Sequence, residues 1–157
     1  MIEAKTLVQI VEMGPEDTKK LLERVRYGHL ACTRDEQPYV VPIHYAYKDP
    51  DVFIFTTEGK KTGIIKDNPK VCLQVEEVIY RRHWQSVIVT GEAERLTERK
   101  EIDGAMEFIT AVNPTLTPAI SIHWLDQWIR SNVDVVYRIT PATITGRTTL
   151  ERSTPNK

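Results

Sequence analysis

The run YVVPIHYAYKDPDVFIFTTEGKKTGIIKDNPKV, residues 39–71, determines most of what the sequence predicts about the fold. Two apolar segments rich in β-branched and aromatic residues, 39–47 and 52–56, indicate consecutive strands. Asp49-Pro50-Asp51 between them is typical of a turn. A short helix is predicted over residues 61–67. The segment therefore predicts two adjacent strands that lead directly into a helix.

The turn before this helix, TTEGKK at residues 56–61, combines hydroxyl groups, a glycine and two lysines. The N–H groups of a helix's first turn have no partner inside the helix, and the helix dipole favours an anion there. Lys60 and Lys61 oppose that dipole by roughly 0.3–1 kcal/mol each, and a bound phosphate would compensate them. The alternative interpretation is a solvated surface pair, with Glu58 as the favourable charge. The local pattern leaves both open.

The remaining sequence predicts a mostly β protein with flanking helices. Further strands are expected over residues 29–33, 70–78, 84–96 and 133–139, with an extension over 144–148, and further helices from Pro15 and over 97–112. Gly28 suits the residue after the first helix, and Gly91 marks a bulge or bend. Short turns between about six strands predict a mostly antiparallel barrel or sheet. We expect one domain over residues 1–150 and a frayed tail over 151–157.

Composition narrows the class of protein. A chain of 157 residues fits one ordinary domain, and its net charge of -1 argues against a broad nucleic-acid or anionic-membrane surface. No apolar stretch approaches the roughly 20 residues that span a bilayer, and the N-terminus lacks a secretory pattern. Cys32 and Cys72 lack CxxC spacing and suggest reduced thiols in the cytoplasm. The histidines show no ligand spacing, so no metal site is predicted.

Eight blocks of sequence, in this order, resemble a known family. They are GHLA at 28–31, PYVVPIHYAY at 38–47, FIFTTEGKK at 53–61, NPKVC at 68–72, WQSV and GEAE at 84–94, VYRITP at 136–141 and ITGR at 144–147. The set resembles the pyridoxamine 5′-phosphate oxidase-like split-barrel flavoproteins, and within them the nitroimidazole-resistance-type branch. The resemblance covers the chain from Gly14 to Arg147.

The resemblance implies a six-stranded split β-barrel that forms a homodimer and holds FMN at the subunit interface. It implies flavin contacts along one strand edge, phosphate contacts at the strand-to-helix turn, and an approach to the flavin from a later strand. Carried over by position, these residues are Val41, Pro42, Ile43 and His44 for the flavin edge, Thr56, Thr57, Lys60 and Lys61 for the phosphate end, and Gln85 or Ser86 for the later strand.

Two departures bear on the activity. The oxidases that act on vitamin B6 carry functional basic residues where this chain has Tyr39 and His44, and their C-terminal substrate-binding segment is not recognisable here. B6 oxidation is therefore not carried over. The sequence favours an FMN-dependent oxidoreductase acting on a small molecule by two-electron transfer. A flavin carrier or redox sensor without turnover, and a split barrel that binds haem or a deazaflavin, stay open.

His44 is the candidate catalytic residue. An imidazole beside a flavin could donate a hydrogen bond or a proton, because its pKa lies near neutrality. The alternative interpretation is that it closes the groove or satisfies a backbone carbonyl. Trp84, Trp124 and Trp128 could stack on a ligand, although packing in the core or an interface is commoner for such residues.

Overall fold

The computed structural model describes residues 6–112 and 135–153. Its elements, in chain order, are β1 (Thr6–Glu12), α1 (Pro15–Val25), β2 (Tyr27–Arg34), β3 (Gln37–Lys48), β4 (Asp51–Thr56), α2 (Lys60–Asp67), β5 (Lys70–Tyr80), β6 (His83–Arg95), α3 (Arg99–Val112) and β7 (Val135–Ser153). The predicted roles of Trp124 and Trp128, and the predicted start of the last strand at residue 133, lie outside the described residues.

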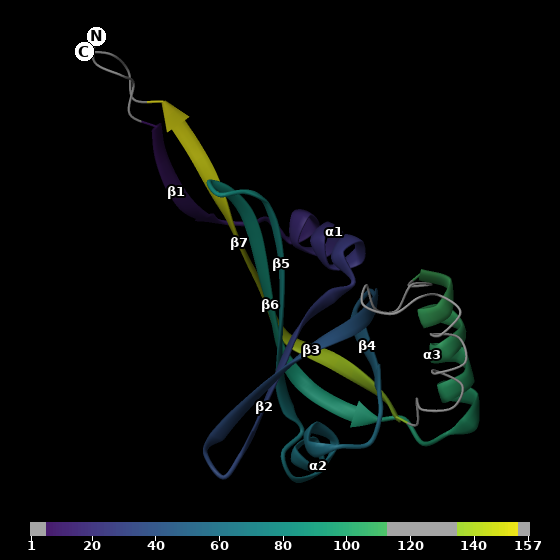
Figure 1. Cartoon of the computed structure of the whole chain (residues 1–157). Coiled ribbons are helices and arrows are strands. Elements are labelled where there is room, and N and C mark those ends of the chain that lie inside the picture. Colours follow the sequence, from purple (N-terminus) through teal and green to yellow (C-terminus); the bar gives the residue numbers. More distant parts are fainter. Residues whose placement is uncertain (1–5, 113–134, 154–157) are drawn as a thin grey trace.

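Six strands close into a ring. The strand order is β7-β4-β3-β2-β5-β6, all pairs are antiparallel, and β6 pairs again with β7 to complete the circle (Figure 1). This confirms the predicted six-stranded antiparallel split barrel with flanking helices. β1 lies outside the ring and pairs only with the C-terminal half of β7.

The C-terminal strand differs from the prediction. β7 continues through Pro141 to Ser153, so residues 151–153, which were expected in the tail, belong to the strand. The cause is β1, whose residues 6–8 pair with residues 151–153 and satisfy their backbone groups. Pro141 lies where the β6–β7 register shifts, at the bulge that Gly91 predicted. Residues 154–157 lie outside the described part of the chain.

An arm extends from the ring. It consists of β1, the end of β7 and the β5–β6 hairpin, which turns at Arg81-Arg82 (Figure 1). Leu7, Val8 and Ile10 of β1 are all exposed, so β1 presents apolar side chains on both of its faces. In the described part of the chain neither face of β1 packs on a core, so its sequence lacks the alternation by which a half-buried strand is recognised.

Two apolar clusters hold the structure together. The larger fills the ring with side chains such as Tyr45, Ile54, Leu73 and Val87, each 1% exposed or less. The smaller packs Ala105 and Ile109 of α3 against Ala46, Phe55 and Val136 of the ring strands β3, β4 and β7. α2 covers the end of the ring at which β4 stops (Figure 1).

Candidate functional site

β3 has an edge that β4 leaves open. The Tyr45 N–H donates to the Arg26 carbonyl at 3.2 Å, so the main-chain groups of Tyr45 face β2. On its other side β3 pairs with β4 only from Lys48 back to Tyr45, which pairs with Ile54. β4 then continues beside β7 alone. The first half of β3 is therefore a strand edge in the described structure, and this is the split of the barrel.

The open edge carries polar main-chain groups. Successive residues of an antiparallel strand direct these groups to opposite sides, so those of Val41 and Ile43 face β2 and those of Val40, Pro42 and His44 face the open edge. Pro42 lacks an N–H, as is typical of an edge. The edge therefore offers donors and acceptors from the segment in which flavin contacts were predicted.

The first turn of α2 has the features of an anion site. Gly59 is the N-cap, and its N–H donates to Thr62 Oγ1 at 2.9 Å. The first turn contains no acidic residue. Glu58, the charge that the alternative interpretation required, forms an ion pair with Arg95 of β6 and accepts a hydrogen bond from Thr62. Its carboxylate is therefore already engaged beside the helix rather than within its first turn.

Both lysines lie against one cross-strand pair, Cys32 and Tyr39. Lys60 Nζ lies 5.0 Å from the centre of the Tyr39 ring. Lys61 is half-buried, and burial lowers its pKa, while the same lysine lowers the otherwise raised pKa of the buried Cys32 thiol. Within residues 6–112 and 135–153, neither lysine has a carboxylate within ion-pair distance. In the described structure, two cations without carboxylate partners thus lie between α2 and the start of β3.

Thr56 and Thr57 form the start of this turn, between the end of β4 and the first residue of α2. Thr56 is buried at the end of β4, and its hydroxyl contacts the Thr57 carbonyl at 3.4 Å. Thr57 is half-buried and follows the last strand residue. The structure therefore places the four residues predicted for the phosphate end in one turn.

His44 packs against Tyr27 of β2. The two residues are cross-strand partners, and their rings meet edge to face with centres 5.5 Å apart. Burial lowers the pKa of His44, and a hydrogen bond with the Arg26 backbone partly opposes this. That backbone contact is the one named in the alternative interpretation of His44. Its imidazole is held on two sides next to the open edge.

We call the side of the sheet that carries His44 the outer face. Cross-strand partners share a face, which places Tyr27, His29, Gln74, Ile88 and Ser86 on it too. Gln85 points to the opposite side, where α1 lies and where Arg24 pairs with the neighbouring Glu77. Of the two residues predicted on the later strand, only Ser86 therefore lies on the face of His44.

Sequence analysis missed three polar residues of the outer face. The Tyr27 and His29 rings lie 5.8 Å apart, and His29 Nδ1 lies 3.4 Å from Gln74 Oε1. The Gln74 amide donates to Ser86 Oγ at 3.2 Å. A signal existed, because Tyr27 and His29 alternate with buried Gly28 and Leu30. Their link to Gln74 needed the β2–β5 register, which no local pattern contains.

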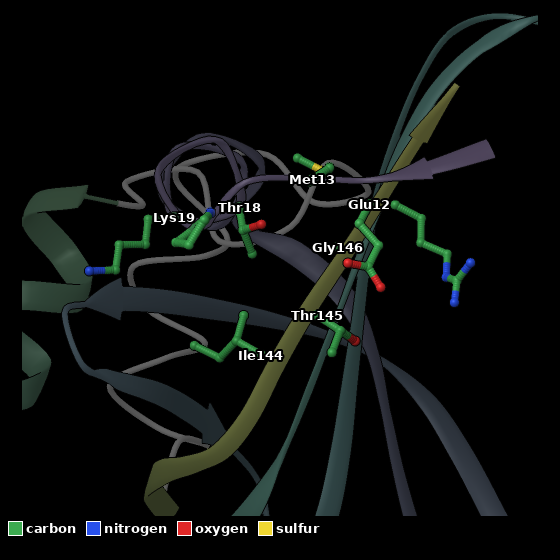
Figure 2. Close-up of a pocket in the computed structure, with 9 residues that line it drawn as sticks. Glu12, Met13, Thr18, Lys19, Ile144, Thr145 and Gly146 are labelled. Atoms are coloured by element: carbon green, nitrogen blue, oxygen red, sulfur yellow. The ribbon is translucent and has the colours of Figure 1, made fainter. Parts of the chain in front are cut away.

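A separate hollow lies where the end of β1 and the start of α1 meet the middle of β7 (Figure 2). Met13 donates its N–H to the Gly146 carbonyl at 2.8 Å, and a side chain at Gly146 would come within 2.8 Å of Thr18 Oγ1. None of the residues predicted for the cofactor lines this hollow. It shapes the base of the arm rather than the open edge.

Two classes of feature are absent from residues 6–112 and 135–153. No helix there is long and apolar enough to cross a bilayer. No group of histidine, cysteine or carboxylate side chains there has the arrangement of a metal site.

Residues 15–148 match the model of the pyridoxamine 5′-phosphate oxidase family. The chain belongs to this family. A crystal structure of an FAD-binding protein from Mesorhizobium loti is 32% identical, with a TM-score of 0.70, and the alignment covers 93% of this chain and 99% of that one. The family therefore includes a flavin-binding relative that matches the chain along nearly its whole length.

Two further proteins are similar to the chain in fold or in part of the sequence. The structure of a candidate 5-nitroimidazole antibiotic resistance protein from Bacteroides thetaiotaomicron has a TM-score of 0.70 over 95% of each chain, and at 16% identity it shows the fold alone. A curated Rhizobium meliloti protein of uncharacterized function is 39% identical over 84 residues. That stretch is 54% of this chain and 56% of the relative, so the match spans about half of the curated protein.

Proposed function

We propose that the chain binds FMN between the open edge of β3 and the first turn of α2, and that it is an FMN-dependent oxidoreductase acting on a small molecule by two-electron transfer. The observation that carries the proposal is a pair of lysines that have no carboxylate partner among residues 6–112 and 135–153, in a first turn without acids, beside an open strand edge. A flavin nucleotide has two matching parts, a phosphate dianion and a planar ring with a polar rim.

The donors at α2 suit a phosphate. The N–H groups of Lys60, Lys61 and Thr62 are the first three of the helix and have no partner within it. Charge-assisted hydrogen bonds from amides and ammonium groups are the usual partners of phosphate oxygens. Bound phosphate would also offset the burial that lowers the pKa of Lys61. We therefore assign the phosphate to this turn.

The edge of β3 suits the ring. The N–H groups of Val40 and His44 and the carbonyl of Pro42 face outward at alternate positions, so they can pair with the rim of a flavin. A bound flavin supplies the electron-transfer chemistry. The chain's own contribution is to orient the ring along the edge and to hold a neutral imidazole at His44, whose pKa is lowered by burial.

Substitution of both lysines tests the phosphate assignment. Lys60→Ala with Lys61→Ala should weaken flavin binding at least tenfold, because the phosphate loses two charge-assisted partners. Lys66→Ala is the matched control, since Lys66 lies in the last turn of the same helix. Fluorescence titration of the apoprotein measures the affinity, and circular dichroism verifies the fold. Equal affinity in the wild type and the double variant would contradict the assignment.

The cofactor itself is identified by what the purified protein releases. The Mesorhizobium relative is described as FAD-binding, which supports a flavin, and the proposed anion site at α2 has the donors for the one phosphate group of FMN. Chromatography of the released cofactor, with titration of the apoprotein by FMN and FAD in parallel, separates the two. Release of haem or a deazaflavin would support the third hypothesis of the sequence analysis instead.

Turnover separates an enzyme from a carrier or sensor. Reduction of the flavoprotein by a nicotinamide nucleotide and rapid reoxidation by quinones, nitro compounds or B6 vitamers would support an oxidoreductase. A flavoprotein that reacts with none of them would support the carrier or sensor hypothesis. The expected compartment is the cytoplasm, consistent with two cysteines that are free thiols.

The proposed partner is a second copy of the chain. The outer face and its continuation along the arm expose a row of apolar side chains, Val8, Ile10, Tyr27, Val40, Val78 and Ile88. Monomeric proteins rarely expose so many on one face. A symmetric dimer would cover this row and close the flavin site, with Ser86 approaching the flavin from one of the two subunits.

A further inference from the structure

The outer face contains a polar chain that the proposed flavin chemistry does not yet use. It begins at Glu76 on β5, passes through Gln74 and ends at His29 on β2. Gln74 Nε2 lies 3.4 Å from Glu76 Oε2 and 3.2 Å from Ser86 Oγ, and Gln74 Oε1 lies 3.4 Å from His29 Nδ1. The three side chains are cross-strand or same-strand neighbours on one face.

The hydrogen bonds between these side chains determine which nitrogen of His29 carries the hydrogen. An ionised carboxylate only accepts hydrogen bonds, so Glu76 requires the NH2 group of Gln74 on its side. The amide oxygen of Gln74 then faces His29 and can only accept. His29 must therefore donate from Nδ1, and in the neutral ring its Nε2 is left as an acceptor.

His29 lies next to the proposed flavin contacts. It is the cross-strand partner of Pro42, one of the residues at the open edge, and its ring contacts Tyr27, which contacts His44. The four side chains of His29, Pro42, Tyr27 and His44 thus form one block on two strands. A planar substrate placed over a flavin at this edge would lie within reach of this block.

We propose that His29 is a second proton-transfer residue of the site, held by Gln74 and Glu76 so that Nε2 exchanges the proton. The inference rests on the proposed flavin function. Reduction of a quinone requires one hydride, supplied by the reduced flavin, and one proton. The N–H bond at Nε2 of doubly protonated His29 breaks as the substrate oxygen takes the proton, and solvent then returns a proton to Nε2. Throughout, the Nδ1 hydrogen stays with Gln74.

Several ionisable groups face His29. They are Tyr27 on its own strand, His44 on β3 beyond Tyr27, Glu76 and Cys72 on β5, and Arg147 on β7 beside Ser86. Among the described residues, Glu76 is the carboxylate that is linked to His29 through hydrogen bonds. Changes at Gln74 and Glu76 are therefore the direct test of how His29 is held.

The tautomer can be measured in the apoprotein. Long-range ¹H–¹⁵N spectra should show His29 in the Nδ1–H form in the wild type, and a mixture of forms in Gln74→Leu and Glu76→Gln. His83 is an internal control, because it contacts Tyr80 through a similar edge-to-face ring pair on the arm and should not change. An Nε2–H form in the wild type would overturn the proposal.

Kinetics tests the role. In protein whose bound flavin is reduced with dithionite, reoxidation by menadione should be about 10²-fold slower in His29→Gln, with equal flavin affinity and one ionisation missing from the pH–rate profile. His83→Gln should match the wild type. A His29→Gln variant with the wild-type rate and profile would overturn the role of His29 alone. A wild-type chain that binds no flavin would overturn the proposed function instead.

Discussion

Lys61 is expected to lower the free energy of unfolding of the apoprotein and to strengthen flavin binding. It is half-buried, lacks a carboxylate partner in the described structure and lies at the positive end of a helix dipole. Lys61→Met should therefore raise the free energy of unfolding of the apoprotein by about 0.5–1 kcal/mol, and weaken flavin binding. Lys66→Met should not stabilise, because a cation in the last turn is favourable.

Urea denaturation of the apoprotein and flavin titration measure both quantities for Lys61. If Lys61→Met destabilised the apoprotein and bound flavin normally, the lysine would be a solvated surface charge. That outcome would restore the alternative interpretation of the lysine pair.

His44 should affect turnover and acid stability separately. His44→Gln should retain flavin and slow turnover about 10²-fold if the imidazole transfers a proton. Because burial lowers its pKa below the ordinary 6.5, the unfolded chain takes up this proton at higher pH than the folded chain. The contribution of neutral His44 to the free energy of unfolding is thus fully present above pH 6.5. It is lost as the pH falls through the lower pKa of the folded state.

The variant should therefore lose less stability than the wild type as the pH falls below 6.5. Urea denaturation across this range measures the difference, with His83→Gln as the control. A variant with normal turnover but flattened acid stability would make His44 a structural residue. Loss of flavin together with activity would make it a binding residue.

Single residues were predictable where chemistry is local. The lysine pair and His44 could be identified because their residue types and their neighbours within a few positions of sequence indicate the chemistry. Gly28 was misread as the residue after α1, whereas the helix ends at Val25 and Arg26 takes the left-handed conformation at φ 62°. Gly28 is in β2, and what requires it there comes from β5, more than 40 residues away.

At the scale of elements, the close approach of two strands at a glycine could not be predicted from the sequence. A side chain at Gly28 would clash with the Gln74 carbonyl oxygen and press on Val75. Gly28→Ala should therefore lower the free energy of unfolding by about 1–3 kcal/mol. The matched control is Gly104→Ala in α3, where nothing lies within 4 Å and a gain of up to about 1 kcal/mol is expected. Chemical denaturation compares the two, and equal effects would contradict the close approach of β2 and β5.

The elements that sequence patterns missed are those with distant partners. Strands of the ring alternate between core and solvent, so β2 to β6 were found near their correct positions. β1 and the end of β7 come from opposite ends of the chain and pair with each other. In the described structure neither has a buried face that would impose alternation of apolar and polar residues. These two segments are strands because they pair with each other, and a local sequence pattern does not contain that pairing.

The whole molecule combines a closed ring with an uncovered surface. Tyr27 and Ile88 of the outer face are 40% and 42% exposed although they flank the proposed site, and the apolar row continues onto the arm. In a single copy the proposed flavin site would lie beside this open face, and a second copy is the proposed cover. The polar chain from Glu76 to His29 would lie beneath the same cover, where exclusion of water strengthens its hydrogen bonds.

Assembly is expected to depend on the outer face. Light scattering should give twice the 18.1 kDa mass of the chain, with and without flavin, because burying the apolar row stabilises the pair. Ile88→Glu should yield monomers and weaken flavin binding, since it places a charge in the centre of the row. Leu150→Glu is the matched control, because Leu150 is 40% exposed but lies on the opposite face of the arm. A wild-type monomer that binds flavin tightly would contradict a shared site, and dissociation by Leu150→Glu alone would move the interface to the other face.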